Sequence, residues 1–182
     1  MAGIETGKIL FVRHGESEAN VRGVFAGQKD DSPLTENGRQ QAKEVGELLT
    51  SRGISIDRVI SSPLIRARET AEIIVRTIGN DSLKVENDER ILEYDMGVMT
   101  GIPFRRVTSF EMISADGAED PEKFGMRVDN FFEQLLLINN ENILVVGHGG
   151  IAKMLETRKK GLPTCTFLDI PLVPNAEIME IR

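Results

Sequence analysis

Two glycine-flanked histidines are the residues of this chain best suited to chemistry. His14 lies in the segment Arg13–Ser17 after an apolar run, and His148 lies in Gly147–Gly150 after another. The sequence contains no third histidine. At the end of a buried strand, a glycine lets a bulky group approach the backbone and leaves amide N–H groups open to an anion. The two imidazoles therefore predict a phosphate pocket in which one ring attacks phosphorus and the other assists.

The hydrophobic pattern predicts the scaffold that would position these histidines. Short apolar runs, typical of strands, alternate with amphipathic stretches that are typical of helices. Near-continuous apolar strands indicate helices on both faces, so we expect an α/β fold with a doubly wound, mainly parallel sheet. Both histidines then fall beyond the carboxyl ends of strands, where such sheets bind ligands. The expected strands are 8–12, 56–61, 83–86, 142–146, 166–170 and 177–181, and the expected helices are 35–52, 63–77, 121–138 and 151–158.

Proline and glycine mark where several elements should begin and end. Ser62 and Asp120 each precede a proline, which predicts helix N-caps with proline at the first helical position. Residues 99–119 have mixed polarity, two glycines and a proline, so we expect a loop or lid beside the pocket. With 182 residues and no linker-like segment, the chain 1–182 is expected to form a single domain.

Composition excludes several classes of function. A net charge of −7 argues against nucleic acid as a partner, because a phosphate backbone requires a basic surface. Apolar runs are too short to span a bilayer, and residues 1–8 lack a signal-peptide pattern. Cys165 is the single cysteine, which favours a reducing cytoplasm and a small core or strand position for Cys165. The sequence predicts no metal site and no cofactor, and leaves the oligomeric state open.

Five ordered motifs resemble those of the histidine phosphatase superfamily, which includes the cofactor-dependent phosphoglycerate mutases. The resemblance runs from Lys8 to about Leu155 and implies a phosphoglycerate mutase-like fold and a phosphohistidine intermediate. The motifs are Arg13–Ser17 followed by Asn20 and Phe25–Gly27, Pro33–Ala42, Ser61–Ala71, Leu92–Gly97 followed by Gly101, and Gly147–Gly150.

Phosphoryl transfer needs a nucleophile, positive groups that neutralise the phosphate oxygens, and an acid for the leaving group, and the residues of these motifs can supply all three. A neutral His14 can attack phosphorus, and the planar guanidinium groups of Arg13 and Arg66 match phosphate oxygens in pairs. His148 is expected to assist as a cationic donor to a phosphate oxygen. Glu93 is the expected general acid, which must be protonated near working pH. Further candidates are Glu119 as the reserve acid, and Asn20, Ser17 and the Gly149 amide as lesser phosphate contacts.

The favoured function is a metal-independent phosphomonoesterase acting on a small phosphorylated metabolite. A phosphoglycerate mutase stays open, although the segment after Gly101 lacks the basic residues that mutases carry there and only Arg105 and Arg106 could replace them. A phosphohistidine-protein phosphatase is the next alternative, but that group generally lacks an acid at the position of Glu93. A phosphate-binding module without turnover is the non-catalytic alternative.

A dinucleotide-binding protein is a rival from another class. Gly147, Gly149 and Ala152 match the loose glycine pattern of that fold, with Asp169 after a later expected strand. The pattern is common by chance, and it leaves Arg13 unexplained.

Overall fold

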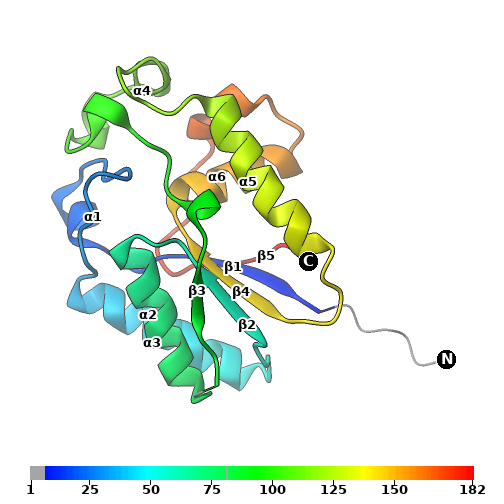
Figure 1. The fold of residues 1–182 in the computed structure, drawn as a ribbon. Coiled ribbons are helices and arrows are strands. Elements are labelled where there is room, and N and C mark those ends of the chain that lie inside the picture. Colours follow the sequence, from blue (N-terminus) through cyan, green and yellow to red (C-terminus); the bar gives the residue numbers. More distant parts are fainter. Residues whose placement is uncertain (1–6, 81) are drawn as a thin grey trace.

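The computed structural model describes residues 7–80 and 82–182, which build one five-stranded sheet with the order β3-β2-β4-β1-β5 (Figure 1). Neighbouring strands are parallel except for β5, which runs antiparallel to β1. The predicted α/β fold with a mainly parallel sheet is therefore confirmed. The strands are β1 (Ile9–Arg13), β2 (Arg58–Ser61), β3 (Val85–Asn87), β4 (Ile143–Gly147) and β5 (Ile178–Glu180).

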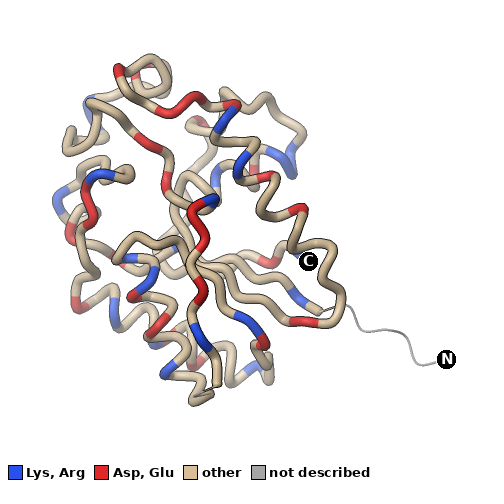
Figure 2. Tube along the Cα trace, in the orientation of Figure 1, with Lys and Arg blue, Asp and Glu red and all other residues tan. Residues whose placement is uncertain are grey.

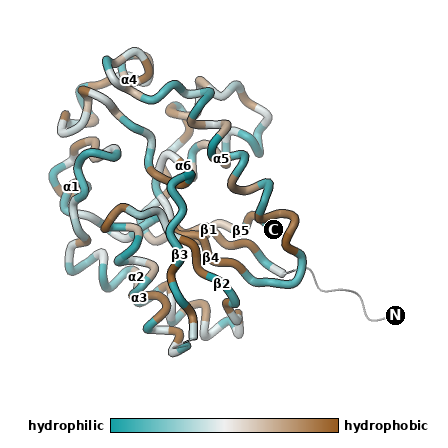
Figure 3. The backbone as a smooth tube through the Cα atoms, in the orientation of Figure 1, coloured by the Kyte–Doolittle hydropathy of each residue, from teal (hydrophilic) through white to brown (hydrophobic). Residues whose placement is uncertain are grey.

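Helices cover both faces of this sheet, as Figure 1 shows. In β1, Ile9 and Phe11 pack in one apolar core with α5 and α6, whereas Leu10 and Val12 pack in a second core with α2 and α3. Both faces of the strand are thus apolar, which explains the brown strands of Figure 3. The helices are α1 (Glu18–Arg22), α2 (Glu36–Ser51), α3 (Ile65–Ile78), α4 (Ser109–Ile113), α5 (Pro121–Leu136) and α6 (Gly149–Lys159).

The two predicted helix starts have different outcomes. Asp120 caps α5 as expected, because its carboxylate accepts a hydrogen bond from the Lys123 amide at 3.0 Å, with Pro121 at the first helical position. The prediction for Ser62 is wrong. Helix α3 begins at Ile65 and has Leu64 as its N-cap, without a side-chain hydrogen bond. The Ser62 hydroxyl is instead paired with His148.

The predicted strand 166–170 is also wrong. Residues Thr164–Asp169 form 3₁₀ turns, in which backbone bonds are local, such as that from the Ile170 amide to the Phe167 carbonyl. Phe167 packs into the core beside α5 and α6, so its apolar side chain is buried without strand pairing. Cys165 is exposed on this turn, which corrects its predicted core or strand position.

The segment expected as a lid is ordered into short helical pieces. It contains a 3₁₀ turn at Phe104–Arg106 and helix α4. Whether it moves, and whether the chain is one domain, stay predictions. Basic and acidic residues are interspersed along the tube of Figure 2. In the described residues we find no helix that combines the length and hydrophobicity needed to cross a bilayer.

Candidate active site

Sheet register brings the two histidines together. Strands β1 and β4 are parallel neighbours in which Arg13 lies opposite Gly147. His14 and His148 are the next residues of each strand, so both emerge at the same carboxyl edge of the sheet. The His14 amide donates to the Gly147 carbonyl at 2.9 Å, and the two ring centroids are 5.3 Å apart. The convergence expected from the sequence is therefore present.

His14 is held with one ring nitrogen free to react. Its Nδ1 lies 2.7 Å from the Gly15 carbonyl oxygen, which can only accept, so Nδ1 carries the hydrogen and Nε2 keeps its lone pair. Burial lowers the pKa of His14 well below its ordinary value, and the charges of Arg66 and Arg13 lower it further. His14 is therefore a neutral imidazole, as a nucleophile must be.

His148 is completely buried beside His14. Its Nε2 is 2.7 Å from the Ser62 hydroxyl, and among the described residues no group hydrogen-bonds to its Nδ1. Burial, Arg66 and His14 together lower the pKa of His148 well below its ordinary value. The ring is thus neutral in this structure, and an anion placed beside it would favour its protonation.

Arg13 and Arg66 bring positive charge to the cavity beside the histidines, and both are almost fully buried. Arg66 follows β2 in the first turn of α3, and its guanidinium donates to the carbonyls of Gly27 at 2.8 Å and Asp30 at 3.1 Å. Arg13 donates from Nη1 to the Val173 carbonyl, while its buried Nε has no acceptor among the described residues. Burial lowers the pKa of Arg13 to about 10, so both groups stay charged at neutral pH.

Ser17 and Asn20 line the same cavity but also build the short helix α1. Ser17 is the N-cap, and Asn20 Oδ1 accepts from the Ser17 amide at 3.0 Å and from Asn175 Nδ2 at 3.2 Å. Gly149 lines the cavity as the first residue of α6, where the helix dipole favours an anion. The structure therefore brings all three expected lesser contacts to the pocket.

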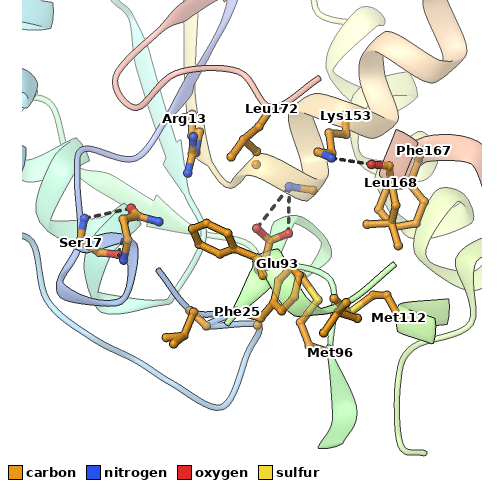
Figure 4. A pocket seen from close by; sticks show the side chains of 18 of the residues that line it. Arg13, Ser17, Phe25, Glu93, Met96, Met112, Lys153, Phe167, Leu168 and Leu172 are labelled. Atoms are coloured by element: carbon orange, nitrogen blue, oxygen red, sulfur yellow. Dashed lines mark hydrogen bonds between the residues drawn. The ribbon is translucent and has the colours of Figure 1, made fainter. Parts of the chain in front are cut away.

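Glu93 reaches the pocket from the loop after β3. Its carboxylate accepts from the amides of Tyr94 at 2.8 Å and Gly150 at 3.0 Å, as the dashed lines to α6 in Figure 4 illustrate for the latter. A Cβ at Gly150 would lie 2.2 Å from Glu93 Oε1, so glycine is what allows this approach. Glu93 is the acid that the structure brings to the cavity.

Glu119, the reserve acid, is engaged elsewhere. It does not belong to the described residues that line the cavity, and its two carboxylate oxygens bind Arg127 at 2.7 and 2.8 Å. Arg127 also donates to the backbone carbonyls of Arg90, Leu92 and Glu93. This ion pair therefore fixes the backbone that carries Glu93, a contribution that no sequence pattern indicates.

The candidate catalytic and phosphate-binding residues line a cavity of about 330 Å³, shown in Figure 4. We call the part of the cavity lined by the buried groups Arg13, His14, Arg66 and Glu93 its inner end. Sequence reasoning missed Lys153, which lies one turn after Gly149 on α6 and extends to the cavity, and it missed the apolar side chains of the outer wall. The periodicity of α6 could have identified Lys153, because residues four apart share a helix face.

The chain matches the model of the histidine phosphatase superfamily (branch 1) over residues 9–182. It belongs to the histidine phosphatase superfamily. The adenosylcobalamin/alpha-ribazole phosphatase of Salmonella typhi is 31% identical over 172 residues, covering 88% of this chain and 83% of the relative. A 2,3-bisphosphoglycerate-dependent phosphoglycerate mutase of Rhizobium etli is 31% identical over 178 residues, covering 88% and 82%. This superfamily member is thus similar both to phosphatases and to phosphoglycerate mutases.

A solved structure agrees with the fold of this histidine phosphatase superfamily member. Bacillus stearothermophilus YhfR superposes with a TM-score of 0.82 at 25% identity, covering 97% of this chain and 91% of that one. The resemblance predicted from the five motifs is therefore confirmed. Asp169 lies in a 3₁₀ turn rather than at the end of a strand, so the dinucleotide-binding alternative loses its acidic residue. Within residues 7–80 and 82–182, no cluster of three His, Cys, Asp or Glu side chains forms a metal site.

Proposed function

We propose that this chain is a phosphomonoesterase that hydrolyses a small phosphorylated substrate through a phosphohistidine on His14. The observation that carries the proposal is the hydrogen bond from His14 Nδ1 to the Gly15 carbonyl, because it leaves Nε2 as the reactive nitrogen. Arg13 and Arg66 lie around the same cavity with guanidinium groups suited to phosphate oxygens. Phosphatases among the relatives support the same activity.

The first half-reaction transfers the phosphoryl group to the protein. Nε2 of His14 forms a bond to phosphorus while the ester P–O bond breaks, and Glu93 donates a proton to the departing alcohol oxygen. Arg13 and Arg66 neutralise the equatorial oxygens. The dianion raises the pKa of His148, which then donates a hydrogen bond to a phosphate oxygen.

The second half-reaction returns the protein to its starting state. Glu93, now ionised, accepts a proton from a water molecule whose oxygen attacks phosphorus. The N–P bond breaks and its electron pair returns to Nε2, which releases inorganic phosphate and neutral His14. Ser17, Asn20 and the Gly149 amide add further contacts to the phosphate oxygens in this scheme.

We propose that neither half-reaction requires a metal ion, because Arg13, Arg66 and His148 provide the charge neutralisation that a metal would otherwise supply. Turnover should accordingly survive treatment with a chelator. A reducing cytoplasm remains our proposal for its location, because Cys165 is the single cysteine in the sequence. The oligomeric state stays open.

A phosphatase agrees with the pocket better than a mutase does. A mutase must hold a second anionic group of a phosphorylated acid, and Arg105 and Arg106 were the residues that could supply that charge. Both are exposed, and neither belongs to the described residues that line the cavity. The mutases among the relatives keep phosphoglycerate mutase activity as the second candidate.

Steady-state assays test the proposal. The wild-type chain should release inorganic phosphate from a panel of phosphomonoesters, and His14→Ala should reduce that release at least about 10³-fold. Conversion of 3-phosphoglycerate in the presence of a bisphosphoglycerate primer should be slow compared with hydrolysis. Fast conversion would establish the mutase instead. Undiminished hydrolysis by His14→Ala would refute the proposed nucleophile.

A further inference from the structure

The outer part of the pocket differs in chemistry from its inner end. Six side chains, which we call the apolar wall, extend from the inner end to the mouth, and Figure 4 labels five of them. They come from three separate segments, which are the loop after α1, residues 96–112 and residues 167–172. The apolar wall consists of Phe25, Met96, Phe104, Met112, Phe167 and Leu172.

The apolar wall is preformed rather than a loose collection of exposed residues. Met112 and Phe167 are almost fully buried. Phe25 and Phe104 pack edge to face with their ring centroids 5.8 Å apart. Leu172, which lies beside Gly149, is 55% exposed, so a ligand that enters the cavity would remove apolar surface from water. The wall therefore favours an apolar group on the substrate.

Charge beyond the inner end is sparse among the described residues that line the cavity. Besides Arg13, Arg66 and the candidate acid Glu93, the one charged side chain is Lys153. Its Nζ already donates to the Leu168 carbonyl at 2.7 Å, and burial lowers its pKa. Its alkyl stem can extend the apolar wall while the ammonium is held at that carbonyl. A second anionic group on a substrate thus finds no arginine to bind it here.

We propose that the substrates are phosphate monoesters of bulky apolar alcohols, such as arylalkyl or branched alkyl phosphates, rather than phosphoglycerates or sugar phosphates. The inference rests on the proposed phosphatase function and adds the substrate class. The phosphate occupies the inner end beside His14, and the organic group lies against the apolar wall.

Esters with alkoxide leaving groups of similar basicity separate this preference from intrinsic reactivity. The assay compares kcat/KM for 3-phenylpropyl phosphate with kcat/KM for glycerol 3-phosphate and for 3-phosphoglycerate. We expect a preference of at least about tenfold for the phenylpropyl ester, since even a single methylene in an apolar pocket is worth about 10-fold to 200-fold. Met112→Gln should reduce that preference several-fold, whereas Phe110→Ser, on the exposed face of α4, should not change it.

Each outcome bears on a separate claim. If the wild-type chain cleaves none of the esters, the proposed function fails. If kcat/KM for glycerol 3-phosphate or 3-phosphoglycerate equals or exceeds kcat/KM for the phenylpropyl ester, the phosphatase function stands and the proposed substrate class is wrong. Lys153→Met should keep the ratio of kcat/KM for the phenylpropyl ester to kcat/KM for 3-phosphoglycerate within about twofold of the wild-type ratio. A selective loss of 3-phosphoglycerate turnover would overturn the apolar assignment. If Met112→Gln unfolds at a lower temperature than the wild type, Phe104→Gln, at a partly exposed position of the same wall, makes the same test.

Discussion

Gly150→Ala should displace the carboxyl group of Glu93 and leave the other groups of the pocket in place. The new methyl carbon would lie 2.2 Å from Glu93 Oε1 and 3.4 Å from the Phe124 ring. The carboxylate is the end of a flexible side chain, so it moves away and loses its hydrogen bonds from the Gly150 amide. The change therefore displaces the acid without touching His14 or either arginine.

The cost to stability should be small. Alanine is about 1 kcal/mol more favourable than glycine inside a helix, which partly offsets the loss of the charged hydrogen bonds, at about 1.5–3 kcal/mol. A net loss of about 0.5–2 kcal/mol corresponds to a few degrees in Tm for a chain of this size. The folded population at 25 °C is therefore unchanged.

The effect on turnover should be large and should depend on the leaving group. General acid catalysis contributes about 10²-fold to 10⁴-fold, so kcat/KM for an alkyl phosphate, which reports the phosphorylation half-reaction, should fall by that factor, or about 2.7–5.5 kcal/mol. For an aryl phosphate, whose leaving group needs little protonation, kcat/KM should fall less than about tenfold. In a Glu93→Gln background the same glycine change should have little further effect, because both variants remove one function. Alkyl phosphate turnover within about threefold of wild type, in a folded Gly150→Ala variant, would refute the assignment of Glu93.

Three further predictions follow from the same contacts. Arg127→Met should lower kcat/KM at least about tenfold for alkyl phosphates and less for aryl phosphates, because it releases the backbone of residues 90–93. Equal losses for the two classes would contradict this positioning role. Glu119→Gln, whose amide oxygen can still accept from Arg127, should keep the wild-type ratio of alkyl to aryl kcat/KM. A collapse of that ratio larger than the one in Arg127→Met would make Glu119 the acid. In phosphate-free buffer, Tm should fall as pH is lowered from 7 to 5, because the unfolded chain protonates its histidines near pH 6.5 while the folded chain keeps His14 and His148 neutral. His14→Gln should flatten that slope, and an unchanged slope would contradict the neutral ring.

The central strands and the site they carry could be predicted because the pattern is strong there. Apolar runs of four residues, each followed by one further residue and then by a histidine and a glycine, place β1 and β4 in the buried sheet. A parallel sheet brings their carboxyl ends together. Paired histidines and two buried arginines therefore follow from the order of the elements. Glu93 follows from the superfamily motif rather than from any local periodicity.

Other features depend on tertiary contacts that single-residue patterns do not encode. Ser62 precedes a proline as an N-cap would, but its hydroxyl is paired with His148 from another strand. The run 166–170 has strand-like residues, yet Phe167 is buried by packing on helices instead. Arg127 looks like an ordinary helix arginine until the segment 90–93 folds against it. The apolar wall is assembled from three segments, so no one of them predicts it.

Trapping the covalent intermediate tests the account most directly. The wild-type chain is mixed rapidly with a phosphomonoester, quenched in alkali, and analysed by mass spectrometry of its peptides. The account predicts an acid-labile, alkali-stable phosphate on the peptide that contains His14, and its absence from His14→Ala. Phosphate on the His148 peptide, or turnover at the wild-type rate by a chain that never carries phosphate on His14, would contradict the account.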